Sequence, residues 1–277
     1  MAYIGAKVGT LVTAGSGGDV TVEDATPEVT LKNTTETDAD GSRGGKITFK
    51  GEQSGGEEST LAQIVGSHDT ALDNEAGDLI FKTNDGSDGA SPTERLRIDS
   101  DGSITTATLG TDNVHLGEGA GAAIVSGGNQ NTLIGKDAGT ALTTGDDNVA
   151  VGFQSLDANT TGTNNTAVGK SSMSAIIDGG SNTAVGLMAL SDDTKGSKST
   201  AMGFQALSTQ NFTSATDSHN TAVGYNAGSL ITTGLFNTAL GSRALASSNT
   251  AWSNTAIGER ALTSDTKGQG NVAVGYR

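Results

Sequence analysis

A five-residue phrase that ends in glycine recurs ten times in the last 165 residues of this 277-residue chain. Seven of the nine steps between successive copies are 17 residues, and the other two are 18 and 21 residues. The clearest copies read NTAVG and start at Asn165, Asn182 and Asn220. Repeats of fixed length are typical of solenoids, in which each repeat stacks on its neighbours. The phrase therefore predicts a rod of stacked units.

Each position of the phrase has its own residue type. Position 1 is asparagine except at Ser199, position 2 is threonine or valine, and position 3 is alanine in eight of the ten copies. Position 5 is always glycine, at Gly117, Gly135, Gly152, Gly169, Gly186, Gly203, Gly224, Gly241, Gly258 and Gly275. Position 4 is always aliphatic or methionine, at Leu116, Ile134, Val151, Val168, Val185, Met202, Val223, Leu240, Ile257 and Val274. We expect position 4 to be the buried core of the repeat.

The phrase is expected to be a β-strand, because glycine and β-branched residues disfavour a helix and helical repeats usually exceed about 30 residues. Residues alternate in a strand, so positions 2 and 4 share one face and positions 1, 3 and 5 share the other. A second apolar pair at positions 8 and 9 predicts a second short strand in each coil. The fold class is then all-β, a parallel β-roll or β-solenoid of about ten 17-residue coils. The asparagine column is expected to form a ladder of side-chain amides.

A 17-residue coil encloses little volume, so a single stack would have a thin core. The alanine and glycine face is flat enough for another backbone to approach closely. We therefore expect a homo-oligomer arranged about the rod axis.

The phrases NTAVG (165–169, 182–186 and 220–224), NTAIG (254–258) and NVAVG (271–275) resemble the head repeats of YadA-like trimeric autotransporter adhesins. The resemblance covers about 60% of the chain, although the coil of that family is commonly shorter than 17 residues. It implies a left-handed parallel β-roll and a homotrimer of parallel chains.

Residues 26–110 predict a small antiparallel β module. Short segments with alternating apolar and polar residues lie between turn residues at 29–32, 46–50, 61–65, 79–82 and 95–98. Phe49 and Phe81 are the only aromatic residues of this region, so its core is thin. Partner chains are expected to complete it.

GDLIFKTNDGS (77–87) and SPTERLRIDSDGS (91–103) resemble segments of tail-fibre and other virion proteins of tailed phages, as does the opening MAYIG. The resemblance implies that residues 1–25 dock onto other virion tail or baseplate proteins, and that residues 111–277 form a shaft behind the 26–110 module. The expected function is a structural tail-fibre component that projects a host-recognition end, in the virion and extracellular after release. The alternative is a head fragment of a bacterial trimeric surface adhesin.

Composition argues against several other functions. The net charge is −15 and the sequence has no run of basic residues, so nucleic-acid binding is not expected. The sequence also has no stretch of 18 apolar residues, so membrane insertion is not expected. With no cysteine and only His68, His115 and His219, we expect no catalytic residues, metal or cofactor. A depolymerase tailspike would need a pair of catalytic carboxylates, and no pair of Asp or Glu recurs at the same positions of the coils. An ice-binding solenoid would need outward threonines, whereas threonine here shares its face with position 4 and is expected to be buried.

Five aromatic residues are candidates for a contact surface. Position 6 holds Phe153, Phe204, Tyr225 and Tyr276, which either stack on a host-surface glycan or, as we prefer, fill space between chains. Phe212 lies in the longer segment 208–219, and an insertion of this kind is expected to project outward, either as a contact surface or, as we prefer, as a neutral loop.

Overall fold

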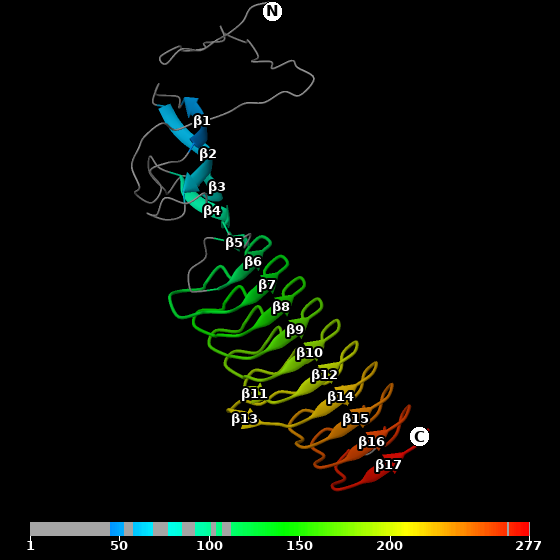
Figure 1. Cartoon of the computed structure of the whole chain (residues 1–277). Helices are drawn as coiled ribbons and strands as arrows, with labels where there is room; N and C mark the ends of the chain where they lie inside the picture. Colours follow the sequence, from blue (N-terminus) through cyan, green and yellow to red (C-terminus); the bar gives the residue numbers. More distant parts are fainter. Residues whose placement is uncertain are drawn as a thin grey trace, which may run out of the picture.

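The computed structural model describes residues 45–52, 58–68, 77–84, 92–100, 104–106, 112–264 and 266–276. These residues form strands and turns and no helix, with an antiparallel sheet followed by a parallel β-solenoid (Figure 1). The predicted all-β fold class is confirmed. The expected docking segment 1–25 and the first predicted strand, 29–32, lie outside the described residues.

The N-terminal sheet is an antiparallel meander of five strands. They are β1 (Gly45–Glu52), β2 (Glu58–His68), β3 (Gly77–Thr83), β4 (Thr93–Ile98) and β5 (Ile104–Thr106). The first four contain the predicted segments 46–50, 61–65, 79–82 and 95–98. The fifth has only three residues, which is too short for an alternating pattern to be visible in the sequence.

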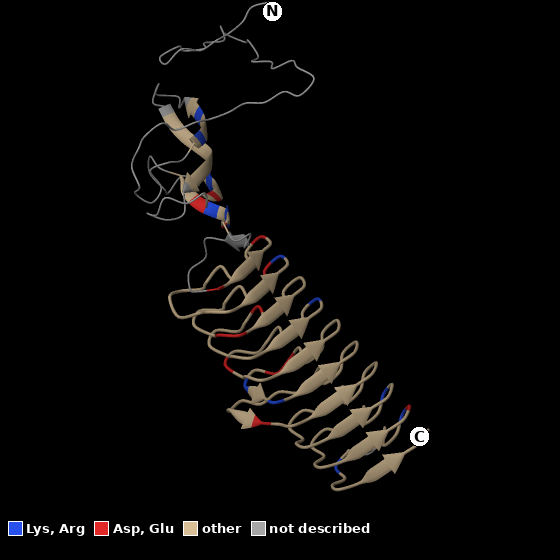
Figure 2. Ribbon diagram, viewed as in Figure 1, with Lys and Arg blue, Asp and Glu red and all other residues tan. Residues whose placement is uncertain are grey.

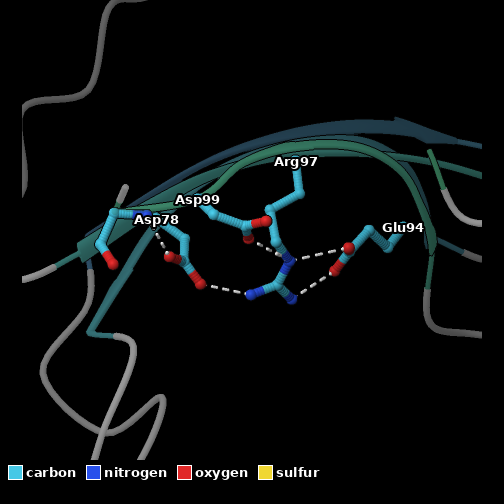
Figure 3. A network of polar contacts seen from close by, with 5 residues as sticks. Asp78, Glu94, Arg97 and Asp99 are labelled. Carbon is cyan, nitrogen blue, oxygen red and sulfur yellow. Dashed lines mark hydrogen bonds and ion pairs between the residues drawn. The ribbon is translucent and has the colours of Figure 1, made fainter. Parts of the chain in front are cut away.

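One face of this sheet carries an ion-pair network centred on Arg97, beside the buried side chain of Ile80 (Figure 3). The Arg97 guanidinium contacts Asp78 and donates to Glu94 Oε1 and Oε2 at 2.9 and 2.7 Å, with Asp99 Oδ1 3.8 Å away. Asp78 also accepts a hydrogen bond from the backbone N–H of Ser100 at 3.1 Å. The hydrogen bonds to Glu94 are the main reason why the pKa of Arg97 is raised, and those from Arg97 lower the pKa of Glu94. This ion-pair network joins β3 to β4 and to the residues that follow β4.

The solenoid contains one parallel sheet of ten strands, each three residues long, with nine turns between them (Figure 1). Each strand pairs with the same phrase positions of the next, as Ala167 does with Ala184. Around the 21-residue step, β11 (Gly196–Ser197) and β13 (Thr216–Asp217) form a separate parallel pair. The ten strands are β6 (Val114–Leu116), β7 (Thr132–Ile134), β8 (Val149–Val151), β9 (Thr166–Val168), β10 (Thr183–Val185), β12 (Thr200–Met202), β14 (Thr221–Val223), β15 (Thr238–Leu240), β16 (Thr255–Ile257) and β17 (Val272–Val274).

Position 3 of the phrase, and not position 4, lines the interior of the solenoid. From Leu133 to Ala256 the position 3 side chains are at most 1% exposed, and larger interior side chains such as Leu156 and Ile176 come from the turns. The prediction of a position 4 core is therefore wrong. A 17-residue coil is so narrow that its strand can usually point only a methyl group inward, against leucine and isoleucine from the rest of the coil. The position 4 side chains lie on the outer face of the sheet: Leu116, Ile134, Val151, Val168, Val185, Met202, Val223, Leu240, Ile257 and Val274.

Positions 7 to 9 form a turn in each coil, so the second predicted strand is wrong as well. In one coil, Gln154 and Leu156 have left-handed φ values of 53° and 55°. Because the backbone reverses at these residues, the side chains of Ser155 and Leu156 are both fully buried, although they are adjacent in sequence. Bulky residues such as leucine rarely adopt this conformation, so the sequence gives little sign of it.

The glycine at position 5 is required by its backbone conformation and by its neighbour in the stack. The φ values of these glycines lie between 124° and 136°, a region that other residues rarely enter. A Cβ atom on Gly186 would also lie 2.5 Å from the carbonyl oxygen of Gly203 in the next coil. Glycine therefore allows successive turns to stack as closely as the strands.

The asparagine at position 1 joins each coil to the next. Asn148 Oδ1 accepts a hydrogen bond from the backbone N–H of Asn165 at 3.0 Å. Asn165 Nδ2 donates to the carbonyl oxygen of Gly179, within its own coil, at 2.9 Å. In other pairs the amides also meet directly, as Asn148 Nδ2 does with Asn131 Oδ1 at 3.1 Å. The predicted amide ladder is confirmed, and it satisfies backbone groups that water cannot reach.

Asn165→Asp should lower the free energy of unfolding by about 2 to 4 kcal/mol, because it buries a charge and places an oxygen against the Gly179 carbonyl. Asn164→Asp is the matched control, since Asn164 is exposed and has a left-handed φ of 59° that aspartate tolerates. Urea denaturation followed by circular dichroism measures both. Equal midpoints for the two variants would contradict a structural role for the ladder.

Gly186→Ala should lower the melting temperature far more than Gly275→Ala. Both positions have φ near 135°, but a Cβ atom meets backbone only at Gly186 and nothing within 4 Å at Gly275. The strained backbone alone costs on the order of 1 to 3 kcal/mol, and the clash with the next coil adds to this. Differential scanning calorimetry makes the comparison, and similar losses in both variants would show that stacking does not require glycine.

Candidate contact surface

The outer face of the ten-stranded sheet is uncharged and carries a continuous column of aliphatic and methionine side chains along its whole length. Of its position 4 side chains, Leu116, Met202, Leu240, Ile257 and Val274 are 36 to 73% exposed, and the other five are half-buried. None of the ten strands contains Asp, Glu, Lys or Arg, and Figure 2 shows charged residues of the solenoid on the turns beside this sheet. A continuous apolar surface of this kind is typical of a face that another protein covers.

Threonine at position 2 lies on this outer face beside the aliphatic side chains. The expectation that these threonines are buried inside the coil is wrong, because position 3 points into the coil and positions 2 and 4 therefore point outward. Position 2 is valine in three strands, and the neighbouring position 4 column mixes Val, Ile, Leu and Met. The face is therefore an uneven apolar surface and not a uniform array of hydroxyl groups. The seven threonines are all half-buried: Thr132, Thr166, Thr183, Thr200, Thr221, Thr238 and Thr255.

Position 6 of the phrase forms a column beside the strands in which four of the ten side chains are aromatic and four are Lys or Glu. The rings of Phe204 and Tyr225 stack with centroids 5.2 Å apart and an interplanar angle of 10°. The guanidinium of Arg243 lies 5.7 Å from the Tyr225 ring centroid. Because Phe204 and Arg243 come from the coils on either side of Tyr225, they contact its two ring faces. A sugar needs an open ring face, so this geometry favours protein contacts at the exposed ring edges over glycan stacking.

The other two aromatic residues of this column are also exposed. The Lys170 ammonium lies 5.6 Å from the ring centroid of Phe153, and Tyr276 is 64% exposed in the last described coil. The structure thus brings Phe153, Phe204, Tyr225 and Tyr276 into one column. The 17-residue spacing made this arrangement predictable.

The longer coil does not present Phe212 as a contact residue. Phe212 is only 6% exposed, and its backbone N–H donates to Asp193 Oδ1 at 3.2 Å. The prediction that Phe212 forms part of a contact surface is therefore wrong, because its side chain is buried, although residues 213–215 that follow it are exposed. Gln210 points inward too, and its Nε2 donates to Asp193 Oδ2 at 2.6 Å.

This buried cluster replaces the asparagine that is missing from the ladder at Ser199. Gln210 Nε2 donates to Ser199 Oγ at 2.8 Å, and Gln210 Oε1 accepts from Asn220 Nδ2 at 2.8 Å. Burial raises the pKa of Asp193, against the hydrogen bonds that it accepts from Gln210 and from the backbone of Gly196. No motif predicts this cluster, although Ser199 and the 21-residue step occur in the same coil.

The histidines of the solenoid are far apart in the stack and differ in their surroundings. His115 occupies position 3 of β6, where burial lowers its pKa, and His219 stacks on Phe236 with centroids 5.3 Å apart. Within the part of the chain that the structure describes, no three His, Cys, Asp or Glu side chains are grouped so as to hold a metal ion.

Comparisons with protein-family models, curated proteins and solved structures gave no match to this chain. None of the described residues belongs to a helix long and apolar enough to cross a membrane. The apolar outer face and the aromatic side chains at position 6 are therefore the features from which a function is inferred.

Proposed function

We propose that the chain is a structural tail-fibre component of a tailed-phage virion, and that its solenoid forms a homotrimeric shaft. The shaft holds a host-recognition end away from the particle. The observation that carries the proposal is the apolar outer face, which is uninterrupted across ten parallel strands.

A second copy of the same solenoid matches this face better than an unrelated protein. The outer side chains repeat at the strand spacing of about 4.8 Å, so a partner must offer apolar groups at that spacing along the whole sheet. Another copy has this repeat in every strand. Met202 and Leu240 of one copy can then pack against the outer face of the next, with the edges of Phe204 and Tyr225 beside the contact. Three copies, and not two, follow from the resemblance to YadA-like heads.

A stack in which hydrogen bonds connect every coil to the next is suited to a spacer. The backbone N–H of Leu156, for example, donates to the carbonyl of Ser172 one coil further along, at 3.0 Å. The mechanism is therefore geometric, and we propose that the chain has no catalytic activity. Residues 1–25 are proposed to bind virion tail or baseplate proteins, and a host-surface glycan or protein is the proposed distal partner. The alternative with the same geometry is a bacterial trimeric surface adhesin.

The double substitution Val168→Glu and Val185→Glu should break the shaft into smaller species, because it places carboxylates on the apolar outer face of two adjacent strands. Light scattering should give the native protein about three times the chain mass of 27.6 kDa and this variant less. Thr161→Glu with Ile177→Glu is the control, since both residues are exposed and lie on turns outside the sheet. A native protein that is monomeric would overturn the proposed shaft.

Removal of residues 1–25 should leave a folded, oligomeric fibre that is absent from purified particles. The proposed role of that segment is docking, whereas the shaft carries its own ladder and interface. Mass spectrometry of purified virions measures incorporation, and light scattering controls for assembly. Normal incorporation of the shortened chain would refute docking through this end, and detection of the native chain only in cell envelopes would favour the adhesin alternative.

A further inference from the structure

The N-terminal sheet has an apolar face opposite its Arg97 network. The strand registers place Ile47, Ile64, Phe81 and Leu96 side by side across four strands. Among these and their neighbours, Ile47, Phe49 and Leu79 are 39 to 50% exposed. No described strand packs over this face. Its described members include Ile47, Phe49, Ala62, Ile64, Leu79, Phe81, Leu96 and Ile98. Arg95 reaches the edge of this face, where its Nε donates to Thr83 Oγ1 at 3.2 Å.

The outer face of the solenoid cannot by itself fix how two copies align along the rod. The same three residues, TAV, form Thr166–Val168, Thr183–Val185 and Thr221–Val223. If one copy slides by one coil, about 4.8 Å, equivalent residues face each other again. A slip of this kind loses only one of the ten strand positions. As in a regular β-sheet, repetition therefore leaves the register weakly specified.

We propose that the apolar face of the N-terminal sheet packs against the same face of other copies and sets the register of the shaft. This inference rests on the proposed self-association of the solenoid. The sheet occurs once in the chain. If two copies slipped by one coil, their sheets would no longer face each other and this contact would be lost. Its last strand, β5, contacts the first solenoid strand, β6 (Figure 1). Copies aligned along the solenoid therefore hold their sheets close together.

The composition of the face also favours a second copy as its occupant. A symmetric contact brings each residue near the same residue or its neighbours in another copy. On the apolar face these are uncharged groups such as Ile47 and Phe49, which can pack together. On the opposite face Ile80 is already buried, and the exposed groups are Lys46, Lys50 and the carboxylates around Arg97, where like charges would repel.

The chain contains no cysteine, so introduced thiols report the register without interference. Chains carrying Val168→Cys and chains carrying Val185→Cys are co-expressed with distinct tags, and the assemblies are oxidised. Matched disulfides (168 to 168 and 185 to 185) indicate alignment, and mixed disulfides (168 to 185) indicate a slip of one coil. With the native sheet, matched disulfides should predominate. With Ile47→Glu and Phe49→Glu added, mixed disulfides should rise several-fold, whereas the control pair Lys46→Glu and Lys50→Glu should leave the pattern unchanged.

A second measurement keeps the inference testable if the glutamate variants fold poorly. Phe49→Cys alone should cross-link between chains, and Lys50→Cys, on the opposite face, should not. Two outcomes would overturn the role of the sheet while leaving the shaft intact. One is that Phe49→Cys forms no cross-link, and the other is that the glutamate variant folds well and still gives only matched disulfides. Absence of any disulfide between chains at 168 or 185, together with a monomeric mass, would instead overturn the proposed self-association and this inference with it.

Discussion

The narrow interior of the 17-residue coil is the constraint on which the rest of the structure depends. Coils stack at the spacing of parallel strands, and eight of the ten strands contribute an alanine, such as Ala167 or Ala184, to the interior. The remaining interior space is filled from the turns, by residues such as Leu156 and Ile176. Branched and long side chains at positions 2 and 4 therefore have no room inside. The apolar outer face is a direct consequence of this geometry and needs a partner to be covered.

The sequence was sufficient to predict the period, the strand at each phrase, the parallel stacking and the asparagine ladder, but not the turn at positions 7 to 9. These follow from local rules, since alternation in a strand shows which residues share a face and a fixed period shows which residues stack. It was not sufficient to predict which face points inward. That choice depends on the width of the coil, which is set by turns in which residues such as Gln154 and Leu156 adopt left-handed conformations. Because leucine gives no local signal for that conformation, the inside and the outside of the repeat were exchanged.

The coil that begins at Ser199 shows that the ladder requires a side-chain amide, which does not have to come from an asparagine at position 1. Serine there removes the amide that links one coil to the next, and Gln210 supplies an amide from another part of the same coil. Phe212 of the same segment is buried as well, whereas residues 213–215 stay exposed. The insertion and Ser199 are therefore connected. The extra chain length of this coil brings the Gln210 amide to the place in the ladder where an asparagine is missing.

The same regularity that stiffens the rod weakens the specification of its assembly. Each added coil extends the apolar face by one more equivalent strand, so it strengthens contact with another copy without indicating where that copy should sit. Alignment must come from a part of the chain that is not repeated. Among the described residues, the N-terminal antiparallel sheet has its own uncovered apolar face, and its last strand adjoins the first coil. In a fibre of this kind the repeated solenoid provides affinity between copies, and the N-terminal sheet, which is not repeated, sets their register.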